Sequence, residues 1–386
     1  MRNTLTLRRP RELAVRRPYV ASQPDPWLFF AVAALAAIGL VMIYSASSVT
    51  AYAEHLDPAY YVKRQFLWLM VGSACAYGAY RMEYLILRRF APYVLVAGII
   101  GLLLVFVPHV GVRANGVHRW IGFHAMTLEP SEFGKLALVV FLAAWLSGRE
   151  PRIDITKIVG GLVPAIVPVV AMAGLVFMEP DLGTTSLIVL TSFVLLFAGG
   201  ARIPHLVLAV LALLPPVAIE MLHNPMWRAR IFAFLDPWRD PQNTGFHIIQ
   251  SLYALGTGGF HGVGLGASRE KFFYLPEQFT DFIFSVLGEE VGLIGALVVI
   301  ALFVVLAFRA VRIALAARES FGFLLAIGCM AMIVVQAFVN IGVVTSSWPV
   351  TGVPLPFISF GGSALVVDLI AAALILNVGR HRRVRA

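Results

Sequence analysis

The sequence predicts an all-α polytopic membrane protein with about ten transmembrane helices. Of its 386 residues, 59% are hydrophobic and only 13% are charged, and the mean hydropathy is +0.84. Soluble proteins are about a quarter charged, and apolar runs of about twenty residues indicate membrane-spanning helices. A transmembrane barrel is excluded because its strands would show short alternating segments instead.

Ten apolar runs define the predicted spans, and an even number places both termini on one side of the membrane. The spans cover residues 27–46, 66–80, 92–107, 133–147, 158–178, 182–197, 206–222, 282–308, 321–344 and 364–378. No internal repeat or linker interrupts them. The chain therefore reads as one integral membrane domain (27–378) between two basic tails, 1–26 and 379–386.

Lys and Arg residues gather on one predicted face. The two tails and the short loops on the same side carry 20 of the chain's 30 Lys and Arg residues. By the positive-inside rule this face is cytoplasmic. The net charge of +9 is then a topology signal and a contact with anionic membrane lipid, and nucleic acid is not an expected partner.

Signal-peptide, disulfide and metal signatures are absent from the sequence. The first apolar run has the length of a true span and no small-residue cleavage site. Cys75 and Cys329 are single residues inside predicted spans, and the nine His show no metal-ligand spacing.

Three longer loops lie on the opposite, outer face. They are residues 108–131, 223–281 and 345–363, and the second, between the seventh and eighth spans, is by far the largest. Long loops are uncommon in compact domains unless they are functional. Their common side predicts a site at the outer leaflet.

Four carboxylates surround the start of the eighth predicted span: Glu277, Asp281, Glu289 and Glu290. Simple capping of the helix by Thr280 or Asp281 is one explanation. A cap needs only one such residue, however, whereas acids recur along this stretch. Because ionisable residues at membrane spans usually face a cavity or a partner, the stretch predicts a functional site.

Other charged residues near the spans leave alternatives open. Glu132 and Lys135 are three apart on one helical face, so they form either an interfacial ion pair or the polar wall of a cavity. Asp368, in the middle of the tenth span, should face the bundle, with no partner evident from the sequence. The outer arginines are either solvated loop charges or ligands for a phosphate or pyrophosphate: Arg113, Arg119, Arg228, Arg230 and Arg239.

Glycines are concentrated between residues 256 and 266, in GTGGFHGVGLG. The segment contains overlapping GxG patterns, but no strand precedes it. A dinucleotide-binding fold is therefore not supported, and tight backbone turns are the expected use.

Several long motifs match one known family. The two longest are LPEQFTDFIFSVLGEEVGLIG (275–295) and PVTGVPLPFISFGGSAL (349–365). The supporting segments are IGLVMIYSAS (38–47), NGVHRWIGF (115–123), EPSEFGKLA (129–137), EPDLGTT (179–185), FLDPWRDP (234–241) and GTGGFHGVGLGAS (256–268). By these motifs, which extend over nearly the whole chain, the sequence resembles the SEDS proteins (shape, elongation, division and sporulation).

The resemblance implies a ten-helix peptidoglycan glycosyltransferase of the cytoplasmic (inner) membrane. Such an enzyme polymerises lipid II on the extracytoplasmic side, with a class B penicillin-binding protein as partner. The segments SREKFFYLPE and GEE look more like the division-type FtsW branch than the elongation-type RodA branch, which remains the alternative. Other division proteins are then expected partners as well.

The resemblance also assigns residues. The catalytic Asp of the family's TDFIF motif corresponds to Asp281, and the Glu and Lys of its PSE…K motif fall on Glu132 and Lys135. The other residues expected to bind substrate or shape the cavity are Arg119, Arg230, Glu277, Thr280, Glu289, Ser359, Gly361, Gly362 and Ser363.

This sequence departs from the family pattern at four motif positions. Glu129 and Glu179 stand where Gln is usual, Phe279 where His is usual, and Phe360 where Tyr is usual. The missing His counts against any mechanism that needs an imidazole at that position. The catalytic Asp is retained.

The expected chemistry is an inverting displacement of undecaprenyl pyrophosphate, with Asp281 as general base. Lys135, Arg119 and Arg230 are the expected cations for the pyrophosphate, and a divalent ion (Mg²⁺ or Mn²⁺) is a further candidate without assigned ligands. Two alternatives are a lipid II flippase, which buried charges would also suit, and a non-catalytic scaffold, against which the retained Asp281 argues. No inverted repeat or paired broken helices support transport.

Overall fold

The computed structural model describes residues 23–114, 117–123, 126–148, 155, 158–269, 271 and 275–381. Most of both predicted basic tails, residues 1–22 and 382–386, lies outside the described residues. Within them the chain forms twelve α-helices and a small three-stranded sheet.

The ten predicted spans coincide with ten of these helices. They are α1 (Pro26–His55), α2 (Tyr60–Arg81), α3 (Leu85–Leu104), α4 (Pro130–Leu146), α5 (Val163–Met178, preceded by the π-turn η1, Ile158–Leu162), α6 (Leu182–Ala198), α7 (Ile203–His223), α10 (Ile283–Leu315), α11 (Ser320–Val344) and α12 (Gly362–Arg380). The prediction of a helical polytopic membrane protein is confirmed.

Six helices in the described residues are long and apolar enough to cross a membrane: α1, α3, α5 with the end of its π-turn, α10, α11 and α12. α4 and α6 have only 17 residues each, and α2 carries Lys63 and Arg64 in its first turns. The number of ten membrane crossings therefore stays a prediction.

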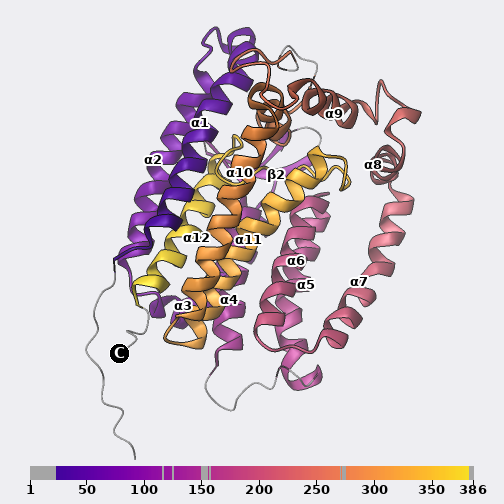
Figure 1. The fold of residues 1–386 in the computed structure, drawn as a ribbon. Coiled ribbons are helices and arrows are strands. Elements are labelled where there is room, and N and C mark those ends of the chain that lie inside the picture. The colour runs from indigo at the N-terminus through magenta and orange to yellow at the C-terminus, as the bar shows by residue number, and fades with distance from the viewer. Residues whose placement is uncertain are drawn as a thin grey trace, which may run out of the picture.

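The helices run up and down between two ends of the bundle (Figure 1). The described ends of the chain, at the start of α1 and the end of α12, lie together at one end. Helices α8 (Pro225–Leu235) and α9 (Phe246–Gly258) lie at the opposite end, linked by the short 3₁₀-helix η2 (Pro237–Arg239). This second end is called the loop end below.

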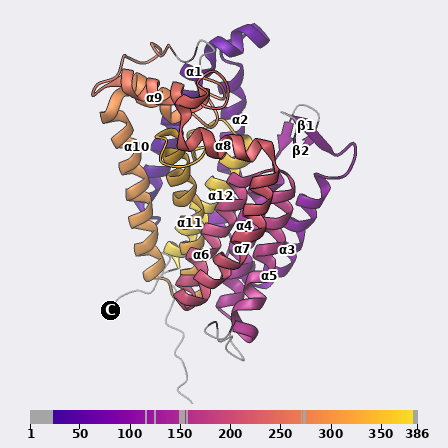
Figure 2. The same cartoon turned by 90° about the vertical axis from the view of Figure 1, so that its right-hand side faces the viewer.

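The predicted outer loops are more ordered than the sequence indicates. The loop 223–281 contains α8, η2 and α9, and the loop 108–131 contains β1 (Gly111–Ala114), β2 (Val117–Phe123) and β3 (Met126–Leu128). The strands pair antiparallel in the order β1-β2-β3. Figure 2 shows the sheet and α8 at the same end of the bundle.

The third loop, 345–361, folds back into the bundle. Leu355 and Ile358 are buried, and a Cβ on Gly39 of α1 would lie 2.5 Å from the Phe357 carbonyl oxygen. Irregular backbone at membrane depth is tolerated only where protein surrounds it. Here α1, α11 and α12 do so, and the loop becomes part of the core.

At the other end, an ion pair joins α1 to α10. Asp25 accepts hydrogen bonds from the amides of Trp27 (3.2 Å) and Leu28 (3.1 Å), which makes it the N-cap of α1. The Arg309 guanidinium also binds both oxygens of this carboxylate. Burial alone would raise the pKa of Asp25, but the hydrogen bonds and charge of Arg309 and the Leu28 amide outweigh it and lower the pKa.

The first prediction concerns this cap. Asp25→Ala should destabilise the protein by about 1–2 kcal/mol, because it removes an N-cap and leaves Arg309 without its partner. Asp25→Asn, which keeps the cap, should lose less. The measurement is thermal unfolding in detergent. The control is Asp57→Ala, which removes a surface ion pair with Lys63 and a hydrogen bond from the Ala59 amide (3.0 Å). An equal fall in Tm for both alanine variants would contradict the assignment.

Candidate active site

A polar cavity of about 460 Å³ opens at the loop end of the bundle. Its walls come from α2, the sheet, α6, α8, the segment before α10, the loop 345–361 and the start of α12. The lining residues are Arg64, Trp68, Arg119, Trp120, Thr127, Glu129, Thr184, Arg230, Glu277, Thr280, Asp281, Gly352, Pro354, Phe360, Gly361, Gly362, Ser363 and Ala364.

Eight residues predicted from the sequence meet in this cavity although they lie far apart along the chain. They are Asp281, Arg119, Arg230, Glu277, Thr280, Gly361, Gly362 and Ser363. Their roles stay predictions, but the fold brings them to one place.

Asp281 is half-buried and lies two residues before α10. Its backbone is held from two neighbouring elements. The Asn340 side-chain amide donates to the Asp281 carbonyl (2.7 Å), and the Ser359 hydroxyl donates to the Thr280 carbonyl (2.5 Å). The Phe360 amide donates to the Phe279 carbonyl (2.9 Å). The carboxylate is thus presented from a rigid turn.

Glu277 is the acid that most affects Asp281. Its backbone adopts a left-handed conformation (φ 53°) that non-glycine residues rarely take. The Thr280 hydroxyl donates to the Glu277 carboxylate (2.8 Å) and holds the turn. Burial, and then the charges of Glu277 and Asp181, raise the pKa of Asp281 to about 7, against the opposing effect of Arg119 and Arg230.

Arg119, on β2, is fixed by the turn between α5 and α6. It donates to the carbonyl of Glu179 (3.2 Å) and to that of Pro180. One guanidinium nitrogen lies 3.4 Å from the Asp181 carboxylate. Asp181 in turn caps α6 by accepting from the Thr184 amide (2.9 Å) and hydroxyl (3.0 Å).

Two further arginines line the cavity. Arg230, on α8, stacks over the Trp227 ring at 5.1 Å, and burial followed by the charge of Arg119 lowers its pKa. Arg64, on α2, donates to the Tyr60 hydroxyl (3.0 Å). Arg64 was not among the residues predicted from the sequence, although its charge at the start of an apolar helix was a signal that could have indicated it.

Glu129 and Glu179 extend the acidic side of the site. Burial, and then the charges of Glu132 and Asp181, raise the pKa of Glu129 to about 8. Burial, and then the charges of Asp181 and Glu129, raise the pKa of Glu179 to about 8. Both acids are therefore largely neutral at pH 7. One Glu179 oxygen is buried without a hydrogen-bond partner.

Three side-chain amides hold the loop 345–361 in place. Gln336 donates to the Pro354 carbonyl (3.0 Å), Asn340 to the Val353 carbonyl (2.7 Å), and Gln65 to the Ser359 carbonyl (3.1 Å). All three are buried on apolar helices. Amides inside apolar runs could have been singled out from the sequence, but their partners could not.

Four predicted site residues lie outside the cavity lining. Glu132 and Lys135 are buried and paired at 2.8 Å, and Lys135 also donates to Gln336 (2.6 Å). Ser359 and Glu289 are also buried. Ser359 is occupied by backbone contacts.

Among the predicted outer arginines whose side chains the structure describes, Arg119 and Arg230 line the cavity and Arg228 and Arg239 do not. Arg228 and Arg239 belong to α8 and η2, and the side chain of Arg113 lies outside the described residues.

The candidate divalent ion has no complete ligand set here. Across the described ranges, no group of three or more His, Cys, Asp or Glu side chains could hold a metal ion. Asp181, the carboxylate nearest Arg119, is engaged by that guanidinium and by Thr184. Within the described residues, the protein side chains alone do not form a site for the ion.

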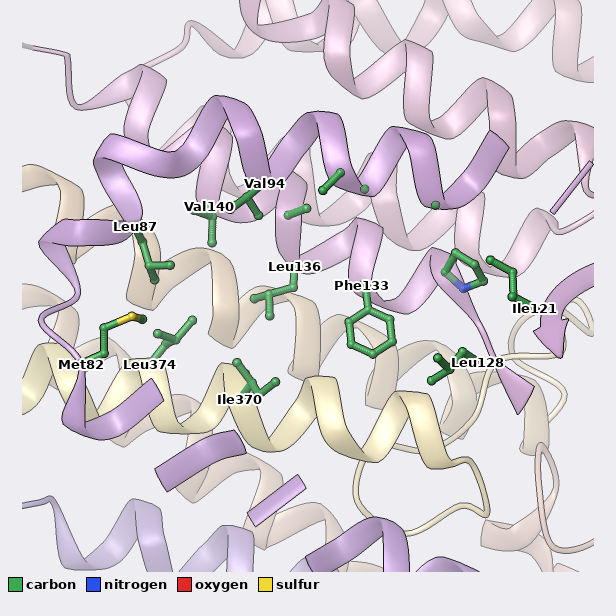
Figure 3. A pocket seen from close by; sticks show the side chains of 15 residues that line it. Met82, Leu87, Val94, Ile121, Leu128, Phe133, Leu136, Val140, Ile370 and Leu374 are labelled. Atoms are coloured by element: carbon green, nitrogen blue, oxygen red, sulfur yellow. The ribbon is translucent and has the colours of Figure 1, made fainter. Parts of the chain in front are cut away.

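A second cavity, of about 400 Å³, is almost wholly apolar (Figure 3). It follows α3, α4 and α12 from Met82 and Leu87 at one end to Ile121 and Leu128 at the other. Leu128 and Pro130 line this groove, whereas Glu129 between them lines the polar cavity. The two spaces therefore lie on opposite sides of the backbone at the start of α4.

Comparison with known proteins gives a consistent picture. Residues 26–384 match the FtsW/RodA/SpoVE family, described as cell cycle protein. The chain is 44% identical to stage V sporulation protein E of Bacillus subtilis, over 94% of this chain and 98% of that protein. It is 40% identical to a protein of Trichlorobacter lovleyi named "Probable peptidoglycan glycosyltransferase FtsW", over 94% and 95% of the two chains.

Solved structures agree. One chain, from a study of "Structural coordination of polymerization and crosslinking by a peptidoglycan synthase complex", superposes with a TM-score of 0.75 at 30% identity, covering 92% of this chain and 98% of that one. The rod shape determining protein RodA of Thermus thermophilus gives a TM-score of 0.68 at 28% identity, over 94% and 98%. By sequence and by fold, this chain belongs to the FtsW/RodA/SpoVE (SEDS) family of multi-pass membrane proteins.

Proposed function

We propose that this protein is a peptidoglycan glycosyltransferase that polymerises lipid II at the outer leaflet of the cell membrane during division. The observation that carries the proposal is the polar cavity, in which one rigidly held carboxylate, Asp281, faces the same space as three arginines. Relatives about 40% identical over most of the chain bear the name of this activity.

The two adjoining cavities suit a lipid-linked sugar donor. The apolar groove matches a polyprenyl chain, and the polar cavity matches a pyrophosphate and its sugars. A donor lying across both would cross at Leu128–Pro130, with its pyrophosphate near the start of α12. Lys135 is buried in its own ion pair, so the pyrophosphate is assigned to Arg64, Arg119 and Arg230.

The reaction is a single displacement at the anomeric carbon of the donor. Asp281 takes the proton of the acceptor 4-hydroxyl while that oxygen forms the new glycosidic bond. The bond from the anomeric carbon to the pyrophosphate oxygen breaks, and undecaprenyl pyrophosphate leaves with the electron pair. Because this leaving group is already stable as an anion, no acid is needed, and attack from the opposite face inverts the configuration.

Asp281 suits the role of general base because its surroundings bring the pKa of its carboxyl group near the working pH. A base is most effective when it is ionised yet still basic enough to accept a proton, which favours a pKa close to neutrality. The pKa of about 7 for Asp281 meets that condition. The neutral forms of Glu129 and Glu179 keep the cavity from repelling a pyrophosphate.

The proposal includes a class B penicillin-binding protein as partner. A similar solved chain was studied as part of a peptidoglycan synthase complex that polymerises and crosslinks, which supports this assignment. The division branch is favoured over the elongation branch because relatives named FtsW are 40–42% identical to this chain, whereas the similar RodA structure is 28% identical. Other division proteins belong to the same proposal.

A decisive prediction concerns Asp281. Asp281→Asn should lower lipid II polymerisation by at least about a hundred-fold, because the general base is lost while the shape of the side chain is kept. The measurement is glycan ladder formation by the purified protein with its partner, alongside transbilayer movement of labelled lipid II in vesicles. Asp240→Asn, a change at a half-buried residue outside the cavity lining, is the control. Ladders at the wild-type level in Asp281→Asn would refute the assignment, and movement without ladders in wild type would favour a flippase.

A further prediction concerns the acid limb of the pH profile, the range in which activity rises with pH. Polymerisation should rise as pH rises through about 7, where Asp281 loses its proton. In Glu277→Gln a nearby negative charge is removed, so the pKa of Asp281 falls and the acid limb should move to lower pH. Glu83→Gln, at the opposite end of the bundle, should leave the limb in place. An unmoved limb in Glu277→Gln would count against the coupling.

Another prediction concerns the alkaline limb of the pH profile, the range in which activity falls as pH rises. As pH rises through about 8, Glu129 and Glu179 ionise and should repel the pyrophosphate, so KM for lipid II should increase. In the double variant Glu129→Gln with Glu179→Gln, this increase should disappear while the acid limb stays near pH 7. A KM that rises equally in wild type and in the double variant would show that other groups govern the limb.

A further inference from the structure

The helix that follows Asp281 is broken. α10 spans Ile283–Leu315, but Gly292 within it has non-helical angles (φ 69°, ψ −170°). The first part, residues 283–291, is therefore a short separate segment at the loop end. Asp281 lies two residues before it, so the placement of this segment also decides where the carboxylate lies.

The break is filled by the glycine-rich segment Gly258–Gly264. The amides of Val263 and Gly264 donate to the carbonyls of Glu289 (2.9 Å) and Glu290 (3.0 Å). In the other direction, the amides of Leu293 and Ile294 donate to the carbonyls of Gly259 (2.9 Å) and Phe260 (3.2 Å). These four bonds pair backbone groups that a broken helix would otherwise leave unpaired. We call this arrangement the glycine clasp.

The clasp leaves no room for a side chain at its centre. A Cβ on Gly262 would lie 2.2 Å from the Glu290 carbonyl oxygen, and one on Gly292 would lie 2.4 Å from the Gly262 nitrogen. Both glycines also have positive φ angles, 79° and 69°. Glycine is required at these two positions by space as well as by conformation.

Two carboxylates beside the break add side-chain anchors. Glu289 accepts from the Arg269 amide (3.0 Å) and from the Ser268 hydroxyl, in the chain that follows the clasp. Glu290 accepts from the Ser45 hydroxyl of α1 at 2.6 and 2.8 Å. Glu289 and Glu290 are both buried, at 2% and 1% exposure. They tie the segment 283–291 to two different parts of the fold.

We propose that the glycine clasp and the Glu290–Ser45 contact are positioning elements for Asp281. They hold the C-terminal end of the segment 283–291, while Asn340 and Ser359 hold the turn that precedes the segment. A displacement of a reacting group by about 1 Å can cost about a hundred-fold in rate. Glu290 then acts through backbone placement, and neither it nor the clasp touches substrate.

The test compares two glycines with the same backbone angle. Gly262 and Gly266 both have φ 79°, but a Cβ on Gly266 meets nothing within 4 Å. Both alanine variants therefore place a side chain at the same positive φ, and only Gly262→Ala puts a Cβ into the clasp. Gly262→Ala should lower kcat for lipid II polymerisation by about ten-fold to a hundred-fold with little change in KM. Gly266→Ala should stay within about three-fold of wild type.

A second pair of variants covers the case in which Gly262→Ala does not fold. Glu290→Ala removes the acceptor for Ser45, whereas Glu290→Gln keeps an oxygen in its place. We expect a lower kcat in Glu290→Ala and a kcat close to that of the wild type in Glu290→Gln. Equal loss in both Glu290 variants, or in both glycine variants, would overturn the proposal.

Because the inference rests on the proposed role of Asp281, one readout is independent of chemistry. Amide hydrogen exchange in residues 283–291 should increase in Gly262→Ala and Glu290→Ala, and not in Gly266→Ala or Asp281→Asn. Faster exchange with an unchanged kcat would refute positioning. Full activity in Asp281→Asn would instead refute the proposed base, whatever the exchange shows.

Discussion

The constraint on which the structure depends is that backbone polar groups inside an apolar bundle must find partners. Two segments near the site are irregular, the loop 345–361 and the break in α10 at Gly292. In water such backbone would be solvated, but within the bundle each unpaired group costs several kcal/mol. The loop is satisfied by the amides of Gln65, Gln336 and Asn340, and the break by a second stretch of backbone. These pairings make the site rigid.

The same low-polarity surroundings govern the charges of the cavity. Asp281, Glu277 and Glu129 share its walls with three arginines, and Asp181 and Glu179 lie behind Arg119. An excess of ionised acids would repel a pyrophosphate. Burial reduces this repulsion because it favours the neutral forms of Glu129 and Glu179. It also raises the pKa of Asp281 to about 7. One physical effect thereby prepares both a base and a site that accepts an anion.

Hydrophobic patterning predicted the helices well because a span must be apolar over about twenty residues, a requirement that no tertiary contact relaxes. It failed for ordered elements that contain no long apolar run. The sheet of residues 111–128 and the helices α8 and α9 lie in stretches that read as polar loops. Arg64 and the three buried amides were missed for a related reason: their importance depends on what the fold places opposite them. Glu132 and Lys135 were noticed, yet they lie outside the cavity lining.

By itself the sequence determined the class of the protein, its ten apolar segments, the clustering of positive charge on one predicted face and the motif that contains Asp281. These follow from composition and local order, which the membrane constrains directly. The tertiary structure alone decided which charges share a cavity, which are sealed in the core, and how the glycine-rich segment is used. Those outcomes depend on close approach between residues tens to hundreds of positions apart, such as Gly262 with Gly292 or Ser45 with Glu290, where hydrogen bonding and the space left for a Cβ select one arrangement.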